Sequence, residues 1–146
     1  QDVIGRIAVL AVFLPVVASQ GGNTGTQSLA VMIRGLVTRE VRPRDARRFI
    51  LIEIWVGFLN GVLIGVITSL AAWAWKGNPY LGVVLGAAMV VNMAVAGLAG
   101  AFIPVAMKRL GFDPAQSSGI FLTALTDVVG FVSFLGFAAL WQDKLL

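Results

Sequence analysis

One carboxylate lies in the middle of an apolar stretch, where a charge is costly. Asp127 stands within an otherwise apolar run from Ala115 to Trp141, which as a helix at roughly 1.5 Å per residue is about 40 Å long. That length exceeds the hydrocarbon core of a bilayer, which is about 30 Å thick. A carboxylate at the midplane costs at least about 2.5 kcal/mol on insertion scales and by default marks a path for ions or protons. Asp127 is therefore the first candidate for an ion site.

Polar and small residues continue from Asp127 along one face of the same predicted helix. The members of this stripe are Gln116, Gly119, Thr123, Asp127, Gly130 and Ser133, and large apolar residues cover much of the remaining surface. A narrow stripe of this kind is typical of a helix that lines a pore. The alternative is close helix packing, with Asp127 paired to a buried amide. The cost of an unpaired buried charge favours the pore.

A second polar segment follows the first apolar run of the chain. Residues 20–27 read QGGNTGTQ and combine three glycines with amide and hydroxyl side chains, among them Asn23. Their oxygens could accept hydrogen bonds from the water shell of a cation. The alternative is a helix kink or a tight turn at the membrane interface. With Pro15 shortly before it, the segment predicts that residues 3–37 form a broken or extended helix near a polar pathway.

The composition indicates the class of protein. The 146 residues are 58% hydrophobic and 12% charged, whereas a soluble domain is about a quarter charged, so we expect an integral membrane protein. The chain has no cysteine and no histidine, which leaves oxygen ligands for any metal and suits hard cations such as Mg²⁺. An enzyme is not expected, because there is no histidine base, no second deep aspartate and no phosphate-binding glycine loop.

The loops between the apolar runs predict how the helices are arranged. We expect an all-α membrane protein, a single ion-conducting domain over residues 1–146 with four transmembrane helices at 3–37, 49–75, 81–107 and 115–141. The net charge of +4 comes from short basic loops, which predicts a lipid bilayer and not nucleic acid as the partner. By the positive-inside rule, the loops at 34–48 and 108–114 are cytoplasmic. This orientation places the N-terminus outside, and we expect a further upstream span in the natural protein.

Several other residues within the spans have packing explanations. For Glu53 two interpretations are equally open: it reaches water or the arginine loop, or it has a role in ion entry. Asn60 and Asn92 are expected to bond between helices, and Asp113 either meets cations or favours a helix start. Small residues spaced four apart predict close helix packing. They are Gly57, Gly61 and Gly65, then Gly82 and Gly86, and finally Ala96 and Gly100.

A two-fold dimer would give Asp127 the charge that a divalent ion needs. Facing copies of the last helix bring two carboxylates together, and isologous contacts are the commonest symmetry in oligomers. Because Mg²⁺ dehydrates reluctantly, we expect it to be held through its water shell. Two alternatives stay open: a proton- or sodium-coupled divalent cation transporter in which Asp127 titrates, and a scaffold in which Asp127 only fixes assembly. The residues do not discriminate Mg²⁺ from Mn²⁺ or Co²⁺.

Three segments together closely resemble the membrane domain of MgtE-type magnesium channels. They are PVVASQGGNTGTQS (15–28), the arginine loop with the following FILIEIWVG (49–57), and LGFDPAQSSGIFLTALTDVVG (110–130). The resemblance covers essentially the whole chain. It implies a magnesium channel or transporter in the plasma membrane, a homodimer of five-span subunits with the pore between them. The first and last spans of this chain would line that pore.

The resemblance also implies roles for individual residues. Asp127 matches the central carboxylate that holds hydrated Mg²⁺, and Asn23 matches the asparagine of the glycine-rich segment. Thr123 stands where a backbone carbonyl faces the ion. Gly119 is a departure, because an asparagine is expected at its position in close relatives. The cytosolic magnesium-sensing domains of the family have no counterpart in these 146 residues.

Overall fold

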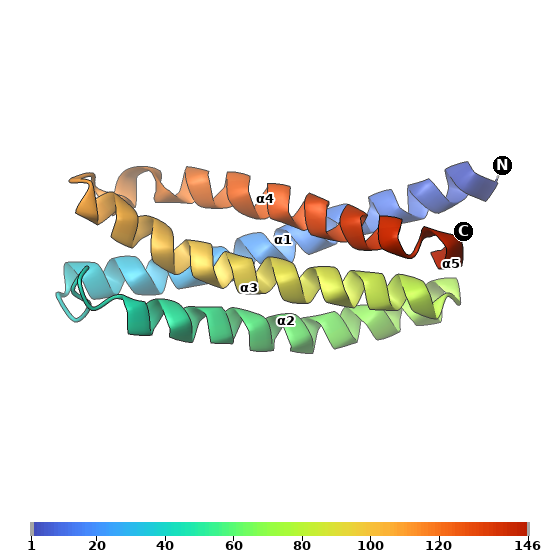
Figure 1. Ribbon diagram of the computed structural model, residues 1–146, viewed down its shortest axis with the longest axis horizontal. Coiled ribbons are helices and arrows are strands. Elements are labelled where there is room, and N and C mark those ends of the chain that lie inside the picture. The colour runs from blue at the N-terminus through green and yellow to red at the C-terminus, as the bar shows by residue number, and fades with distance from the viewer. Residues whose placement is uncertain (1, 146) are drawn as a thin grey trace.

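Four long helices run side by side along the molecule (Figure 1). The computed structural model describes the backbone of residues 2–145 and the side chains of residues 8–116 and 118–145. The elements are α1 (Asp2–Val37), α2 (Arg47–Lys76), α3 (Pro79–Arg109), α4 (Pro114–Leu140) and the short α5 (Gln142–Leu145). Within these residues there is no strand, so the all-α prediction is confirmed. The long helices begin and end within two residues of the predicted spans.

The third helix, α3, is central because it packs along α2, α1 and α4, whereas α1 and α2 barely touch. In the most apolar stretch of α3, 56% of the residues are buried, against 17% in α2 and 22% in α4. Glycines allow α2 and α3 to pack closely along their interface, which we call the α2–α3 seam. A Cβ on Gly57 would collide with the carbonyl oxygen of Met93, and one on Gly97 would collide with that of Glu53. The predicted glycine packing is therefore confirmed at this seam.

Local signals in the sequence set the ends of the helices. At the start of α4 the Asp113 side chain accepts a hydrogen bond of 3.0 Å from the Ala115 N–H, and Pro114 occupies the first turn. The predicted role of Asp113 at the helix start is confirmed. At the other end of the bundle, α2 stops at Gly77, whose φ of 70° is left-handed and favours glycine. These caps fix the start of α4 and the end of α2.

The first helix, α1, runs without interruption, so the predicted break is wrong and the extended alternative is the form present. Pro15 lies on an exposed face, where one missing N–H leaves the rest of the helical ladder intact. The glycines pack against other helices instead of opening the backbone. A Cβ on Gly21 would lie 2.7 Å from Asn92 Cγ on α3, and one on Gly25 would lie 2.9 Å from Leu122 Cδ1 on α4. This packing keeps the segment helical.

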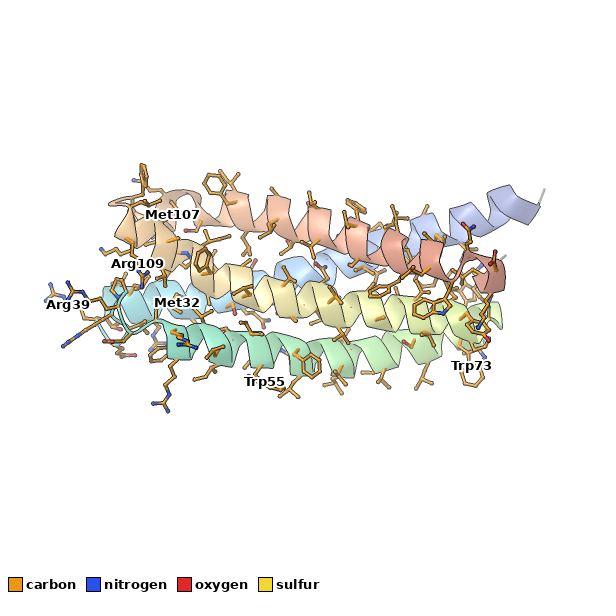
Figure 2. All side chains as sticks on the ribbon, in the orientation of Figure 1. Met32, Arg39, Trp55, Trp73, Met107 and Arg109 are labelled. Atoms are coloured by element: carbon orange, nitrogen blue, oxygen red, sulfur yellow. The ribbon has the colours of Figure 1, made fainter. Side chains whose placement is uncertain are left out.

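Three helical segments are long and apolar enough to cross a membrane: Arg47–Lys76, Pro79–Arg109 and Ser118–Leu140. Figure 2 places Trp73 near one end of the bundle and Arg39 and Arg109 at the other. The two basic segments therefore share one end, as the positive-inside rule requires. The Arg109 guanidinium donates a hydrogen bond to the backbone oxygen of Pro43 and ties these segments together.

Candidate ion-binding site

The carboxylate of Asp127 belongs to the middle residue of α4. Thirteen helical residues precede it and thirteen follow it, so it lies about 20 Å from either end of the helix. Its side chain is half-buried, at the edge of the face that α4 packs against the bundle. A carboxylate in this place is at mid-depth of the span and still accessible from outside the chain. The helix places this carboxylate at its middle, as the sequence predicted, and its contact with an ion stays a prediction.

Two contacts between α1 and α4 place Asp127 beside the glycine and amide segment of α1. Leu122 packs on Gly25, and Gly130 lies against Ala18, where a Cβ on Gly130 would be 3.3 Å from the Ala18 Cα. Asp127 lies on α4 between these two contacts, so residues 18–25 of α1 run past it. Figure 1 shows the crossing, with α1 passing diagonally behind α3 and α4. The two segments that the sequence singled out are therefore neighbours in one chain.

Thr123 and Gly119 lie exposed on α4, about one and two turns from Asp127 toward the basic end. The Thr123 hydroxyl donates to the Gly119 carbonyl at 2.9 Å, so it satisfies its own helix. The Thr123 carbonyl, which the sequence predicted to face the ion, accepts 3.1 Å from the hydroxyl of buried Thr126. Both groups are held in place before any ion arrives. Their contact with an ion stays a prediction.

The side chain of Asn23 lines a polar groove on the opposite flank of α1 from α4. This amide groove has a volume of about 620 Å³. It is lined by Gln20, Asn23, Thr24, Thr26, Gln27 and Ala30 of α1, by Asn60, Leu63 and Ile64 of α2, and by Met93 of α3. No described α4 residue lines it. Within one chain, Asn23 is therefore grouped with Asn60 and not with Asp127, Thr123 or Gly119.

The carboxylate of Glu53 is bonded to another helix, and not to the predicted partners, the arginine loop or water. It accepts a hydrogen bond from the hydroxyl of Ser28, a buried residue of α1. Sequence reasoning missed this bond because Ser28 ends the glycine-rich segment and Glu53 lies 25 residues further along the chain. The spacing of Ser28 four residues after Thr24, on the buried face of α1, is the signal that could have indicated a polar contact.

The amide of Asn92 is a fully buried polar group near the site. It is 0% exposed and donates a hydrogen bond of 2.8 Å to the backbone oxygen of Val17 on α1. The predicted interhelical role is therefore confirmed for Asn92. For Asn60, which lines the amide groove, the predicted interhelical bond stays a prediction.

The chemistry that these groups offer is recognition of a cation by oxygen. Within the part of the chain that the structure describes, no group of three or more His, Cys, Asp or Glu side chains could hold a metal. The Asp127 carboxylate and, on the other flank of α1, the oxygens of the amide groove each suit a hard cation that keeps its water shell, because those waters donate hydrogen bonds to oxygen acceptors.

A comparison with known families bears on what passes this site. Residues 14–137 match the family model MgtE, described as a divalent cation transporter. The chain belongs to the MgtE family. The matched range contains all the candidate residues, from Asn23 to Asp127. With its apolar helices, this MgtE chain is an integral membrane protein.

Three curated relatives within the MgtE family are each named magnesium transporter MgtE. The protein of Enterococcus faecalis is 36% identical over 142 residues, that of Bacillus subtilis 33% over 145, and that of Thermus thermophilus 38% over 140. The alignments cover 97%, 99% and 96% of this chain, but only 31%, 32% and 31% of the relatives. The chain therefore spans about a third of the length of the curated relatives it matches.

Proposed function

We propose that this chain forms the ion path of a Mg²⁺ transporter in the plasma membrane, in which Asp127 carboxylates from two copies hold a hydrated Mg²⁺. The names of the curated relatives support the choice of ion. The observation that carries the proposal is the place of Asp127: it is the middle residue of α4, half-buried, where α4 crosses the polar segment of α1. A carboxylate at this depth costs free energy, and residues of this kind in membrane spans usually have a function.

A homodimer would balance the charge of the ion. One carboxylate offsets half of a divalent charge, and a two-fold axis repeats the same residue from the second copy. Mg²⁺ gives up its waters reluctantly, so contact through water is the mode that two carboxylates on opposite sides of a path would favour. Gly119 and Thr123, exposed between Asp127 and the basic end, would line the next turns of that path. Gly119 adds no side chain, which leaves room for the water shell.

We assign Asn23 to the approach of the hydrated ion. Its amide oxygen can accept from the water shell, and it lies in a groove with three further amide side chains, those of Gln20, Gln27 and Asn60. Because this groove is on the other flank of α1 from Asp127, we expect Asn23 to act before the ion reaches the carboxylates. Polar side chains at this depth are tolerated where they border water.

The fourth span of the proposal is α1, with the basic end of the bundle in the cytoplasm. Its central polar residues make it less apolar than the other three long helices, as expected of a helix that borders an aqueous path. The arginines of the α1–α2 loop and Arg109 lie together at one end (Figure 2). The positive-inside rule orients that end to the cytoplasm.

Flux into liposomes tests the proposal. The purified chain is reconstituted with an internal Mg²⁺ dye, and the wild type is compared with Asp127→Asn. We expect Asp127→Asn to abolish Mg²⁺ flux while leaving the dimer intact. Asp143→Asn is the matched control, because Asp143 lies exposed in α5. Unchanged flux in Asp127→Asn would remove this carboxylate from transport and favour a scaffold. Flux that requires a proton or sodium gradient would favour a coupled transporter.

A further inference from the structure

The amide of Asn92 lies where three helices meet. Asn92 is on α3 and is 0% exposed, and its Nδ2 donates 2.8 Å to the carbonyl oxygen of Val17 on α1. Val17 is also 0% exposed. The contact is therefore a fixed point between α1 and α3 that neither water nor lipid reaches.

Two glycines on different helices make room for this amide. A Cβ on Gly21 of α1 would lie 2.7 Å from Asn92 Cγ and 3.0 Å from Oδ1. A Cβ on Gly130 of α4 would lie 3.1 Å from Nδ2 and 3.3 Å from the Ala18 Cα of α1. The amide thus fills the space that side chains of both helices would take. In contrast, a Cβ on Gly22 would meet nothing within 4 Å.

The Asn92 oxygen makes stability alone a poor explanation for this residue. Oδ1 is buried and has no hydrogen-bond partner among the described residues. A buried acceptor without a donor costs free energy that an apolar residue of the same shape would avoid. The other amide atom, Nδ2, is the one that contacts both α1 and Gly130 of α4. The geometry therefore favours a role in setting the positions of the helices.

We propose that Asn92 is a positioning residue for the ion site, which fixes the crossing of α1 and α4 next to Asp127. Gly130 follows Asp127 by three residues, close to one helical turn. A shift of α4 against α1 at Gly130 would therefore move the carboxylate relative to its symmetry mate. This inference rests on the proposed function, because it concerns the carboxylate that would hold Mg²⁺.

Equilibrium binding of Mg²⁺ to the purified chain, measured by titration calorimetry in detergent, tests the inference without requiring conduction. Asn92→Leu keeps the branched shape and removes the donor. We expect its Kd for Mg²⁺ to rise about tenfold, the lower end of the effect of outer-shell partners at metal sites, with the number of ions per dimer unchanged. A role in stability alone would lower the folded fraction and leave Kd as in the wild type.

Glycine variants provide a matched pair and a double variant. Gly21→Ala places a methyl group against the amide and is expected to raise Kd, whereas Gly22→Ala, next to it in open space, is expected to leave Kd unchanged. In Gly21→Ala/Asn92→Ala the methyl group has room, but the donor to Val17 is gone, so Kd should stay raised as in Asn92→Leu. Equal Kd values in Gly21→Ala and Gly22→Ala would overturn the inference, and this pair carries the test if Asn92→Leu does not fold.

Asp127→Asn distinguishes a failure of this inference from a failure of the proposed function. Binding lost in Asp127→Asn but unchanged in Asn92→Leu and Gly21→Ala would overturn the positioning role alone. Binding unchanged in Asp127→Asn, or absent from the wild type, would overturn the proposed function. Loss in Asp127→Asn together with weakened binding in Asn92→Leu supports both.

Discussion

Ser28 on α1 donates a hydrogen bond to the Glu53 carboxylate on α2, which links two helices that otherwise pack mainly on α3. Ser28 is buried and Glu53 is half-buried. The bond lies one turn beyond Gly25, where α1 packs against α4. The bond gives a structural reason for a carboxylate within the apolar α2. Asp127 is therefore the carboxylate that we assign to the ion.

Removing the hydroxyl of Ser28 should weaken the bundle. We expect Ser28→Ala to lower the free energy of unfolding by about 1 kcal/mol, because Glu53 then lacks its donor inside the membrane. Unfolding by SDS, followed by circular dichroism, measures the change. Thr68→Ala is the control, since the Thr68 hydroxyl bonds only carbonyls of its own helix. An equal loss in both variants would contradict the interhelical role.

The sequence predicted the helices well because their ends carry local signals. The Asp113–Pro114 start and the Gly77 stop can be read from adjacent residues alone. Spacing likewise identified the glycines of the α2–α3 seam. Such features depend on one helix, or on a pattern that repeats along it, so they do not require knowledge of the partner.

The features that could not be predicted from the sequence depend on which helix faces pack together where two helices cross. The break expected near Pro15 is absent because Gly21 and Gly25 are packed by Asn92 and Leu122, residues far along the chain. The partner of Glu53 was missed for the same reason. The position of Asn23, on the flank of α1 away from α4, follows from the rotation of α1 about its axis, which a polar segment by itself leaves open.

The α2–α3 seam should not tolerate a methyl group. Gly57→Ala would press a Cβ into the carbonyl oxygen of Met93, a backbone atom that cannot swing away, and overpacking of this kind costs about 1–3 kcal/mol. Unfolding in detergent gives the value. Gly136→Ala on α4 is the matched control, because its Cβ would meet nothing within 4 Å and alanine favours a helix by up to about 1 kcal/mol. Destabilisation of the same size in both variants would argue against close packing at Gly57.

Substitutions at Asp113 distinguish a helix cap from a cation site. Asp113→Ala should cost about 1 kcal/mol of stability through loss of the cap, whereas Asp113→Asn keeps an acceptor for the Ala115 N–H and should be near neutral. Thermal unfolding measures both. The Kd for Mg²⁺ should be unchanged in each variant. Weaker Mg²⁺ binding in Asp113→Asn would assign the carboxylate to cations instead.

The orientation of the bundle can be tested because the chain has no cysteine. Single cysteines at Arg44→Cys in the α1–α2 loop and at Asp143→Cys in α5 lie toward opposite ends of the bundle. In intact cells, a membrane-impermeant maleimide should label Asp143→Cys at once and Arg44→Cys only after permeabilisation, since arginine-rich loops stay in the cytoplasm. The reverse pattern would invert the proposed topology.

The structure of the chain crystallised with Mn²⁺ tests the central claim most directly, because anomalous scattering marks the ion. We expect a peak on a two-fold axis between two copies, with water between the ion and the two Asp127 carboxylates, and Mg²⁺ should displace it in competition. A monomeric arrangement in which Asp127 faces lipid or a buried amide, with no ion beside it, would contradict the claim.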